Sequence, residues 1–301
     1  MDRFRQMQVF IQVMESGNFT RAAEAMNLPR STVSTEIQTL EDRLKTQLLR
    51  RTTRQVTATH DGLQFLEAAR EIVDAVEASE QMFHPDPDTV QGRLRIDMPS
   101  RIGRRIVIPA LPGFLQAHPG IELELSMTDR LVDIISEGVD CVIRVGALTD
   151  SELICRKLGD VELINCASPG YLAEHGVPEE LDDLPGHYVV NYAARRPYPE
   201  AEWEYVDGAR TRTLATKSLI TVDNAEAYIA SARAGLGVIQ IPKFDVQDLL
   251  ASGELVEIAP QLRPPAMQLS FLYAKRRNLP SRIRVFQEWI SDVLKANGVI
   301  D

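Results

Sequence analysis

The segment from residue 18 to residue 54, NFTRAAEAMNLPRSTVSTEIQTLEDRLKTQLLRRTTR, most constrains the fold of this chain. It reads as two short helices joined by a tight turn and followed by a basic hairpin. The second helix places Val33, Ile37 and Leu40 at spacings of four and three residues, so this apolar stripe is expected to be buried. This order of elements predicts a winged helix-turn-helix.

The opposite face of the second helix carries short polar side chains, Ser31, Thr35 and Gln38, which suit contacts with base edges. Arginines at 50, 51 and 54 follow in the hairpin and suit contacts with phosphate. Taken singly, a polar helix face and an arginine cluster are also typical of an ordinary solvated surface. Their succession within forty residues favours DNA binding.

The chain is 301 residues long, 44% apolar and carries a net charge of −10, unevenly distributed. Residues 1–60 hold nine basic and six acidic residues, whereas residues 61–301 hold 24 and 37. A mildly basic head on an acidic body suits a protein in which only the head meets nucleic acid. We find no apolar run long enough for a membrane span and no signal peptide, so we expect a cytoplasmic protein without a membrane partner.

Residues 60–84 are expected to form one long linker helix after the head, which occupies residues 1–59. Leu66, Ala69, Val73, Val76 and Phe83 form a heptad-like stripe along it. The stripe could pack on the helix's own domain. Pairing with a second copy explains it better, because two DNA-reading heads would then lie side by side. Residues 85–92, PDPDTVQG, are expected to be a hinge.

From residue 93 onward, predicted strands and helices alternate, which indicates a largely parallel sheet with helices on both faces. About 210 residues are too many for one small sheet, so two lobes are expected. We assign residues 93–164 and 267–301 to lobe I and residues 165–266 to lobe II. The fold class is therefore multidomain, with an α-rich head, a long helix and a two-lobed α/β body.

The whole chain resembles the LysR-type transcriptional regulators. The resemblance is most specific in VFIQVMESGNFTRAAEAMNLPRSTVSTEIQTLEDRLKTQLLRRTTRQVTATHDG and continues in LRIDMPSRIGRRIVIPALPGFLQAHPGIELELSMTD, GVDCVIRVG and INCASPGYLAEHG. It implies a winged helix-turn-helix, a dimerising linker helix and an effector domain similar to type 2 periplasmic binding proteins. It also implies a homotetramer, assembled as a dimer of dimers on an interrupted palindrome of double-stranded DNA, with RNA polymerase as a further candidate partner.

The chain departs from the usual pattern of these regulators at the start of the second helix. Leu28-Pro29-Arg30 replaces the common Leu-Ser-Gln, and Thr35-Glu36 replaces a large polar residue after Ser34. Arg30 is therefore a candidate reader of a base or a phosphate. The complete set of candidate DNA contacts is Arg30, Ser31, Thr32, Ser34, Thr35, Gln38, Arg50, Arg51, Thr53 and Arg54.

An effector site is expected where strands of the body end, because ligands of doubly wound sheets bind beyond the carboxyl ends of the strands. Ser100 lies between a strand and a helix, where free amides and the helix dipole favour an anion such as a carboxylate. Ser100 could instead simply cap its helix. The resemblance favours ligand contact by Ser100, Arg101 and Ile102.

Other predicted strand ends supply further effector candidates, each with a helix cap or a turn as its alternative role. These are Thr128, Val145, Gly146, Ser168, Asp223 and Asn224. Trp203 is a candidate for the mouth of the cleft. Arg144 either supplies charge to the cleft or pairs with a carboxylate at a strand edge.

We expect no enzyme, no cofactor and no metal site. The five histidines lie in no zinc-binding or catalytic pattern, and no GxSxG, P-loop or dinucleotide fingerprint is present. The cysteine spacings of Cys141, Cys155 and Cys166 match no zinc pattern, which favours buried reduced thiols. The alternative function is a redox-sensing regulator of the same architecture that uses Cys155 or Cys166.

Overall fold

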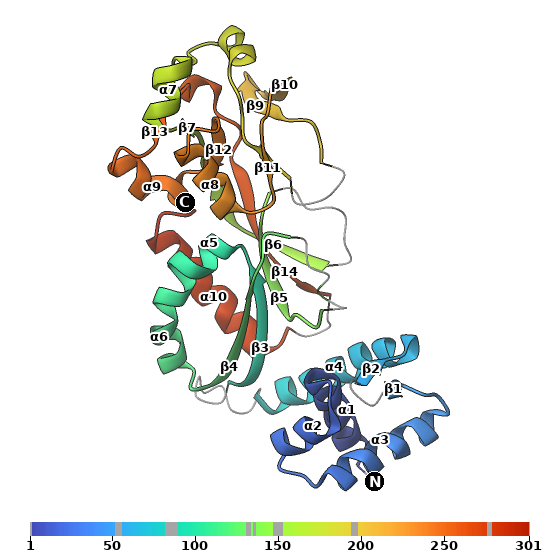
Figure 1. Cartoon of the computed structure of the whole chain (residues 1–301). Coiled ribbons are helices and arrows are strands. Elements are labelled where there is room, and N and C mark those ends of the chain that lie inside the picture. Colours follow the sequence, from blue (N-terminus) through green and yellow to red (C-terminus); the bar gives the residue numbers. More distant parts are fainter. Residues whose placement is uncertain are drawn as a thin grey trace.

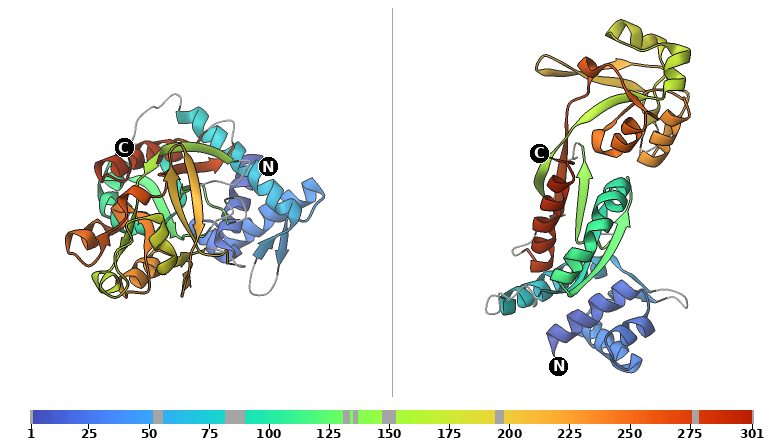
Figure 2. Two further views of the ribbon diagram at one scale, coloured as in Figure 1. Left: turned by 90° about the horizontal axis from the view of Figure 1, so that it is seen from above. Right: turned by 90° about the vertical axis from the view of Figure 1, so that its left-hand side faces the viewer.

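The computed structural model describes residues 2–51, 56–81, 90–130, 134, 137–146, 153–193, 198–275 and 279–300. A helical head lies at one end of the molecule, and a two-lobed α/β body extends away from it (Figure 1 and the right-hand view of Figure 2). None of the helices in these ranges combines the length and the apolar character that crossing a membrane requires.

The head consists of α1 (Arg3–Ser16), α2 (Phe19–Ala25) and α3 (Arg30–Leu44), followed by β1 (Leu49–Arg51) and β2 (Val56–Ala58). The two strands pair antiparallel and form the wing that the sequence predicted. The apolar residues predicted on α3 are buried against α1 and α2. The centre of this core is formed by Val9, Phe10, Val13, Ala22, Ala23, Val33, Ile37 and Leu40.

The long helix α4 (His60–Gln81) follows the wing. Leu66 and Ala69, the first members of the expected heptad stripe, are buried within the chain, and Leu66 belongs to the core of the head. Packing on its own domain therefore accounts for this half of the stripe. Farther along, Val73 and Val76 are half-buried, and Phe83 lies outside the described residues.

Lobe I is a five-stranded sheet with the order β4-β3-β5-β14-β6. Its strands are β3 (Gln91–Met98), β4 (Gly120–Met127), β5 (Cys141–Val145), β6 (Leu153–Val161) and β14 (Met267–Ala274). The prediction of a largely parallel sheet is wrong here. β3 pairs parallel with β4 and β5, but β14 pairs antiparallel with β5 and β6 because the chain returns from lobe II in the opposite direction.

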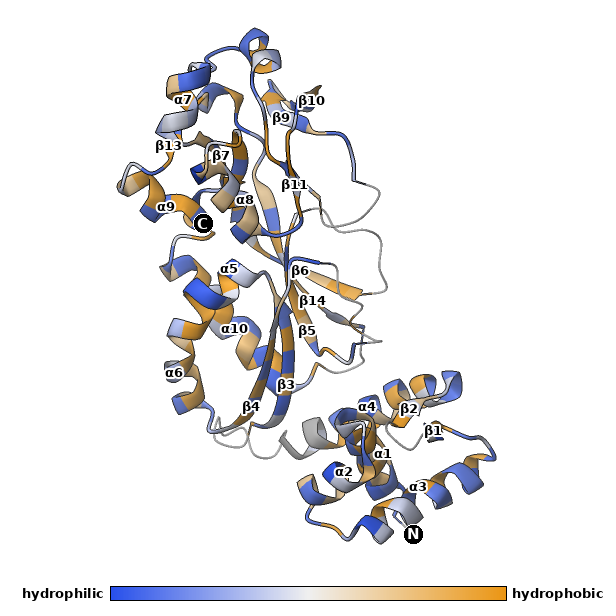
Figure 3. Cartoon of the chain, in the orientation of Figure 1, coloured by the Kyte–Doolittle hydropathy of each residue, from blue (hydrophilic) through white to orange (hydrophobic). Residues whose placement is uncertain are grey.

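The helices of lobe I begin with α5 (Ser100–Ile102), which continues through a π-helical turn (Gly103–Val107) into α6 (Ile108–Ala117). The C-terminal α10 (Ser281–Ala296) packs beside α6. The ring centroid of Phe114 on α6 lies 5.6 Å from that of Phe286 and 4.9 Å from that of Trp289, both on α10. Consecutive residues of β5 and β14 are buried, so both faces of these inner strands are covered. Figure 3 shows hydrophobic residues along the strands of this sheet, interrupted by polar ones.

Lobe II is built on a three-stranded sheet of β12 (Ile239–Pro242), β7 (Leu163–Ala167) and β13 (Val256–Glu257). Two smaller pairs flank it: β8 (Asn191–Tyr192) with β11 (Thr221–Val222), and the hairpin of β9 (Glu202–Asp207) and β10 (Arg210–Ala215). Its helices are α7 (Pro169–His175), α8 (Ala225–Arg233) and α9 (Lys243–Ala251), with 3-10 turns at Leu181–Gly186 and Pro260–Leu262.

The chain crosses between the lobes twice. The first crossing is at Glu162, since β6 belongs to the sheet of lobe I and β7 to that of lobe II. The expected boundary after residue 164 therefore lies inside β7. The second crossing precedes β14, which begins at Met267, the residue at which lobe I was predicted to resume.

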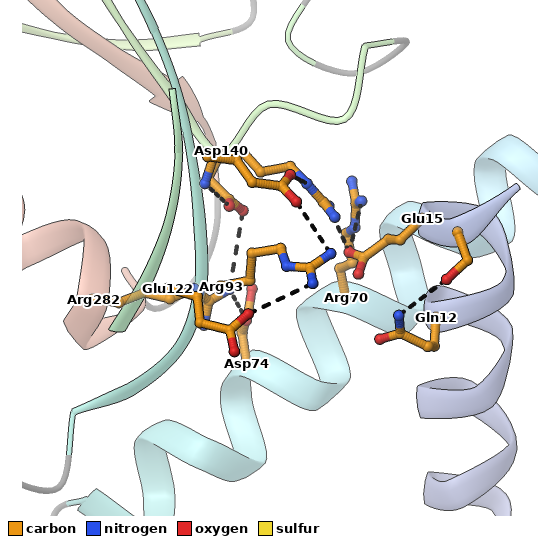
Figure 4. Close-up of polar contacts among 11 residues, drawn as sticks. Gln12, Glu15, Arg70, Asp74, Arg93, Glu122, Asp140 and Arg282 are labelled. Atoms are coloured by element: carbon orange, nitrogen blue, oxygen red, sulfur yellow. Dashed lines mark hydrogen bonds and ion pairs between the residues drawn. The ribbon is translucent and has the colours of Figure 1, made fainter. Parts of the chain in front are cut away.

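The head and α4 contact lobe I through partly buried ion pairs (Figure 4). Glu15 of α1 accepts hydrogen bonds from Arg95 of β3 at 2.6 Å and from Arg70 of α4 at 3.4 Å. Burial alone would raise the pKa of Glu15, but the positive charges of Arg95, Arg70 and Arg93 outweigh it and hold the pKa below its ordinary value. Asp74 of α4 also accepts a hydrogen bond from Arg282 of α10 at 2.9 Å.

Candidate DNA-binding and effector-binding sites

The outer face of α3 is polar and exposed. Arg30, Ser31, Thr35 and Gln38 are exposed, whereas the other two predicted contacts on this helix, Thr32 and Ser34, are half-buried. The exposed four face away from the apolar stripe that anchors the helix in the head. The structure thus presents a helix whose exposed side chains can reach base edges.

The wing is held against α3 by Glu41, whose carboxylate accepts hydrogen bonds from the backbone amides of Leu48 and Leu49 at 2.9 and 3.0 Å. Leu49 points into the core, and Arg50, the next residue of β1, is exposed. The side chains of Arg51, Thr53 and Arg54 lie outside the described part of the chain. Arg50 is therefore the wing arginine that the structure places at the surface.

A cavity of about 540 Å³ lies between the two lobes of the body. The predicted effector residues Arg101, Ile102, Thr128, Val145 and Gly146 all line it from lobe I. This volume falls within the range of about 300–1,000 Å³ that is typical of small-molecule sites. The structure therefore brings five of the six lobe I candidates together around one space large enough for a ligand, and the sixth, Ser100, is not part of the lining.

Asp129 bridges the two lobes beside this cavity. One carboxylate oxygen accepts a hydrogen bond from the amide of Ser100, at the start of α5, at 3.1 Å. The other accepts one from the amide of Ala225, at the start of α8 in lobe II, at 2.9 Å. Ser100 does not cap α5 with its hydroxyl, and its backbone amide, the predicted anion donor, is engaged by Asp129.

The arginines of the cleft are also engaged. Arg101 is buried and crosses between the lobes, where its Nε donates to Asp245 at 2.8 Å and its Nη1 to Glu226 at 3.0 Å. Arg144 donates to the buried carboxylate of Asp97, so the ion-pair alternative describes it. Both guanidinium groups are therefore already paired with carboxylates of the protein.

Five predicted effector contacts, Ser100, Ser168, Trp203, Asp223 and Asn224, are not part of the cavity lining. Ser168 is buried and caps α7 through the amide of Tyr171, and Asn224 caps α8 through the amide of Ala227. Asp223 accepts a hydrogen bond from the side chain of Asn224 and is not part of the lining. Trp203 is fully buried in lobe II, where its Nε1 donates to the carbonyl of Leu262. It alternates with cleft-facing neighbours on β9, so its side chain points the other way.

The lobe II wall was missed from the sequence. It is formed by side chains of several short strands and of the helices α8 and α9, among them Tyr192, Glu202, Glu204, Tyr228 and Gln240. The two-residue strand β8 carries no periodic signal. Only alternation along β9, which places Glu202 and Glu204 opposite Trp203, was available to identify part of this wall.

Burial raises the pKa of Asp245 to about 6, and the nearby Arg101 only partly opposes this effect. The folded protein therefore binds more protons at this site than the unfolded chain between the ordinary pKa of 3.8 and about 6. It follows that the contribution of Asp245 to stability falls as the pH rises through this window, and is constant above it.

We expect the difference in unfolding free energy between wild type and Asp245→Asn to fall by at most about 3 kcal/mol as the pH rises from about 4 to about 6.5. Urea unfolding across this pH range measures the difference, in which other titrating groups cancel. Asp248→Asn, an exposed position on the same helix, serves as the control. A difference that does not change with pH would show that burial does not dominate at Asp245.

The cysteines give little support to a redox sensor. Cys141 and Cys166 are buried, and burial raises the pKa of both thiols, that of Cys166 to about 12. Such thiols stay protonated and react slowly with oxidants. Cys155 is exposed. Among the residues that the structure describes, no cluster of histidine, cysteine and carboxylate side chains is arranged to hold a metal ion.

Comparison with known proteins finds two families along the chain. Residues 4–63 match the family described as bacterial regulatory helix-turn-helix protein, lysR family, and residues 87–295 match the LysR substrate binding domain. The uncharacterized HTH-type transcriptional regulator YhjC of Escherichia coli (strain K12) is 40% identical over 98% of this chain and 99% of its own. The HTH-type transcriptional activator AaeR of the same strain is 30% identical, covering 97% and 94%. The structure of CrgA, a LysR-type transcriptional regulator from Neisseria meningitidis, matches 98% of both chains with 29% identity and a TM-score of 0.60.

Proposed function

Because the chain belongs to the LysR family of transcriptional regulators, and is therefore a regulator and not an enzyme, we propose that it controls transcription by binding a specific DNA sequence through α3 in response to a small molecule in the interlobe cleft. The observation that carries this proposal is the exposed polar face of α3, flanked by the wing arginine Arg50. The cavity between the lobes supplies the place for an effector.

The test separates base reading from phosphate contact. Thr35→Ala or Gln38→Ala is expected to weaken binding to the operator by about 1–3 kcal/mol and to spare binding to random DNA. Arg50→Ala is expected to weaken binding to both DNAs and to lower the slope of log affinity against log salt by about one. Fluorescence anisotropy with both DNAs over a salt series measures these effects. Equal losses on both DNAs for Gln38→Ala would refute the role of α3.

Assembly follows from the same proposal. The head holds a single recognition helix, so two copies are needed to read the two halves of a palindrome. We infer a homodimer formed through α4 and a homotetramer on an interrupted palindrome, acting in the cytoplasm where DNA and RNA polymerase are available. Ile72 of α4 is 43% exposed and Val73 is half-buried, which leaves apolar surface for a second copy.

Strand β3 connects the cleft with the head. Asp97 holds Arg144 and Thr128 at the cavity, and Arg95, two residues earlier on the same face, holds Glu15 of the head. A ligand that binds two arrangements of the lobes with different affinities shifts their populations. The proposal is that this shift reaches the DNA-reading heads through β3.

An anionic effector at Ser100, the expectation from the sequence, requires that the carboxylate of Asp129 leave the amide of Ser100. Under this hypothesis Ser100→Ala would keep its operator affinity and lose its response to small carboxylates. If footprinting showed an unchanged response in this variant, the hydroxyl of Ser100 would not be an effector contact.

A further inference from the structure

The charges around the interlobe cavity favour one class of ligand. Its charged lining residues are two arginines and four carboxylates, those of Asp129, Glu202, Glu204 and Asp245. Both arginines are already paired, Arg101 with Asp245 and Glu226 and Arg144 with Asp97. The cavity therefore offers a ligand a surplus of negative charge and no uncompensated guanidinium group.

The donors that would hold an anion are occupied as well. The amides of Ser100 and Ala225 both donate to Asp129, so the protein's own carboxylate fills the position between the two helix starts. The side-chain amide of Gln240 donates to Asn165 at 2.8 Å and to the carbonyl of Glu204 at 2.8 Å. These polar groups are satisfied without a ligand.

Two acceptors remain on the lobe II wall. Glu202 and Glu204 are two residues apart on β9, so their side chains share the face that lines the cavity. Trp203, which lies between them in the sequence, points to the other side of the strand and is buried in the core of lobe II. Within the described part of the chain, neither carboxylate has a hydrogen bond or an ion pair, and Glu204 is half-buried. Glu202 is exposed, so both carboxylates are open to the cavity, and a positively charged group is the complement that this wall lacks.

Two aromatic rings line the same cavity as these carboxylates. Tyr192 and Tyr228 meet edge to face, with ring centroids 5.3 Å apart, and both line the cavity. The faces of such rings attract cations. Burial and then the negative charges of Asp129 and Asp223 raise the pKa of Tyr192, which is consistent with a negative potential in the cleft.

We propose that the effector of this cleft is a small organic cation, an apolar body that carries a protonated amine, with the ammonium group against Glu204 and Glu202 and beside Tyr192. This inference rests on the proposed function, since it names the class of ligand for the same cleft. Apolar lining from Ile102, Val145, Ile241, Phe244 and Met267 accommodates the body of the ligand.

Three probes of nearly equal size test the charge: 2-phenylethylamine, 2-phenylethanol and 3-phenylpropanoate. Calorimetric titration of the full chain is expected to give affinities in that order, with the amine about tenfold or more tighter than the alcohol. Glu204→Gln and the more exposed Glu202→Gln are each expected to remove most of this preference. Glu174→Gln on α7 loses the same charge outside the cavity and is expected to keep it.

The inference would be overturned if the protein bound the carboxylate as tightly as the amine. It would also be overturned if none of the three probes bound at millimolar concentration. An amine preference that survives both Glu202→Gln and Glu204→Gln would overturn it too. Operator binding, measured in the same preparations, distinguishes failure of the proposed cationic effector from failure of the proposed regulatory function. A preparation that binds operator and prefers the carboxylate refutes only the charge of the ligand, whereas loss of operator recognition in the wild type refutes the regulator itself.

Discussion

Asp97→Ala is expected to destabilise the body by about 3–5 kcal/mol, because it leaves the buried guanidinium group of Arg144 without its carboxylate. Asp97 is fully buried and also accepts a hydrogen bond from the hydroxyl of Thr128. The remaining partners of Arg144 are the carbonyl oxygens of Ile143 and Arg130, which carry no full charge. Urea unfolding followed by tryptophan fluorescence measures this loss.

The fluorescence reports on the body alone, because the two tryptophans of the chain, Trp203 and Trp289, lie in lobe II and lobe I. Asp160→Ala is the matched control, since it breaks an exposed ion pair with Lys157 and is expected to cost less than about 1 kcal/mol. If Asp97→Ala cost no more than this control, the buried pair would not stabilise the cleft.

Val73→Asp is expected to abolish the dimer and, with it, operator binding. The half-buried Val73 lies next to the exposed Ile72 on α4, and a charge buried between two helices costs several kcal/mol. Sedimentation velocity measures the loss of dimer. The tryptophan-detected unfolding of the body is expected to remain unchanged, because the head and α4 contain no tryptophan.

Ala68→Asp supplies the control, since residue 68 is exposed and lies on another face of α4. A Val73→Asp protein that stays dimeric would show that the whole stripe packs on its own chain. The structure already shows this for Leu66, which is buried in the head.

Elements with strong periodicity could be predicted from the sequence almost to the residue. The sequence predicts a first helix at residues 3–16, with Phe4, Met7, Ile11 and Met14 on one face, and a last helix at about 281–296, and these are observed as Arg3–Ser16 and Ser281–Ala296. The last helix buries one apolar face, but the first helix buries Gln6, Val9, Phe10 and Val13 and leaves the predicted face only half-buried, because apolar residues lie on more than one of its sides. The exposed face of α3, which we propose reads DNA, was predicted from the apolar stripe, because the burial of Val33, Ile37 and Leu40 fixes which side remains exposed.

The cleft was only half predictable. Strand ends of lobe I point to it, so Thr128, Val145 and Gly146 were found from their positions along the chain. The opposite wall depends on how short strands of lobe II pair across long sequence separations, as when β12 pairs antiparallel with β7. Charge compensation by Asp129, Asp245 and Asp97 is likewise a product of tertiary structure, and it changes the ligand that the cleft favours.

The ratio of specific to non-specific DNA affinity tests the central claim most directly. The full chain would be used to select its operator from a random library of double-stranded DNA, and its affinity for that operator would be compared with its affinity for unselected DNA at the same salt concentration. A sequence-reading α3 predicts a ratio of about 10³ or more. A ratio near one, or selection that yields no common sequence, would contradict the account.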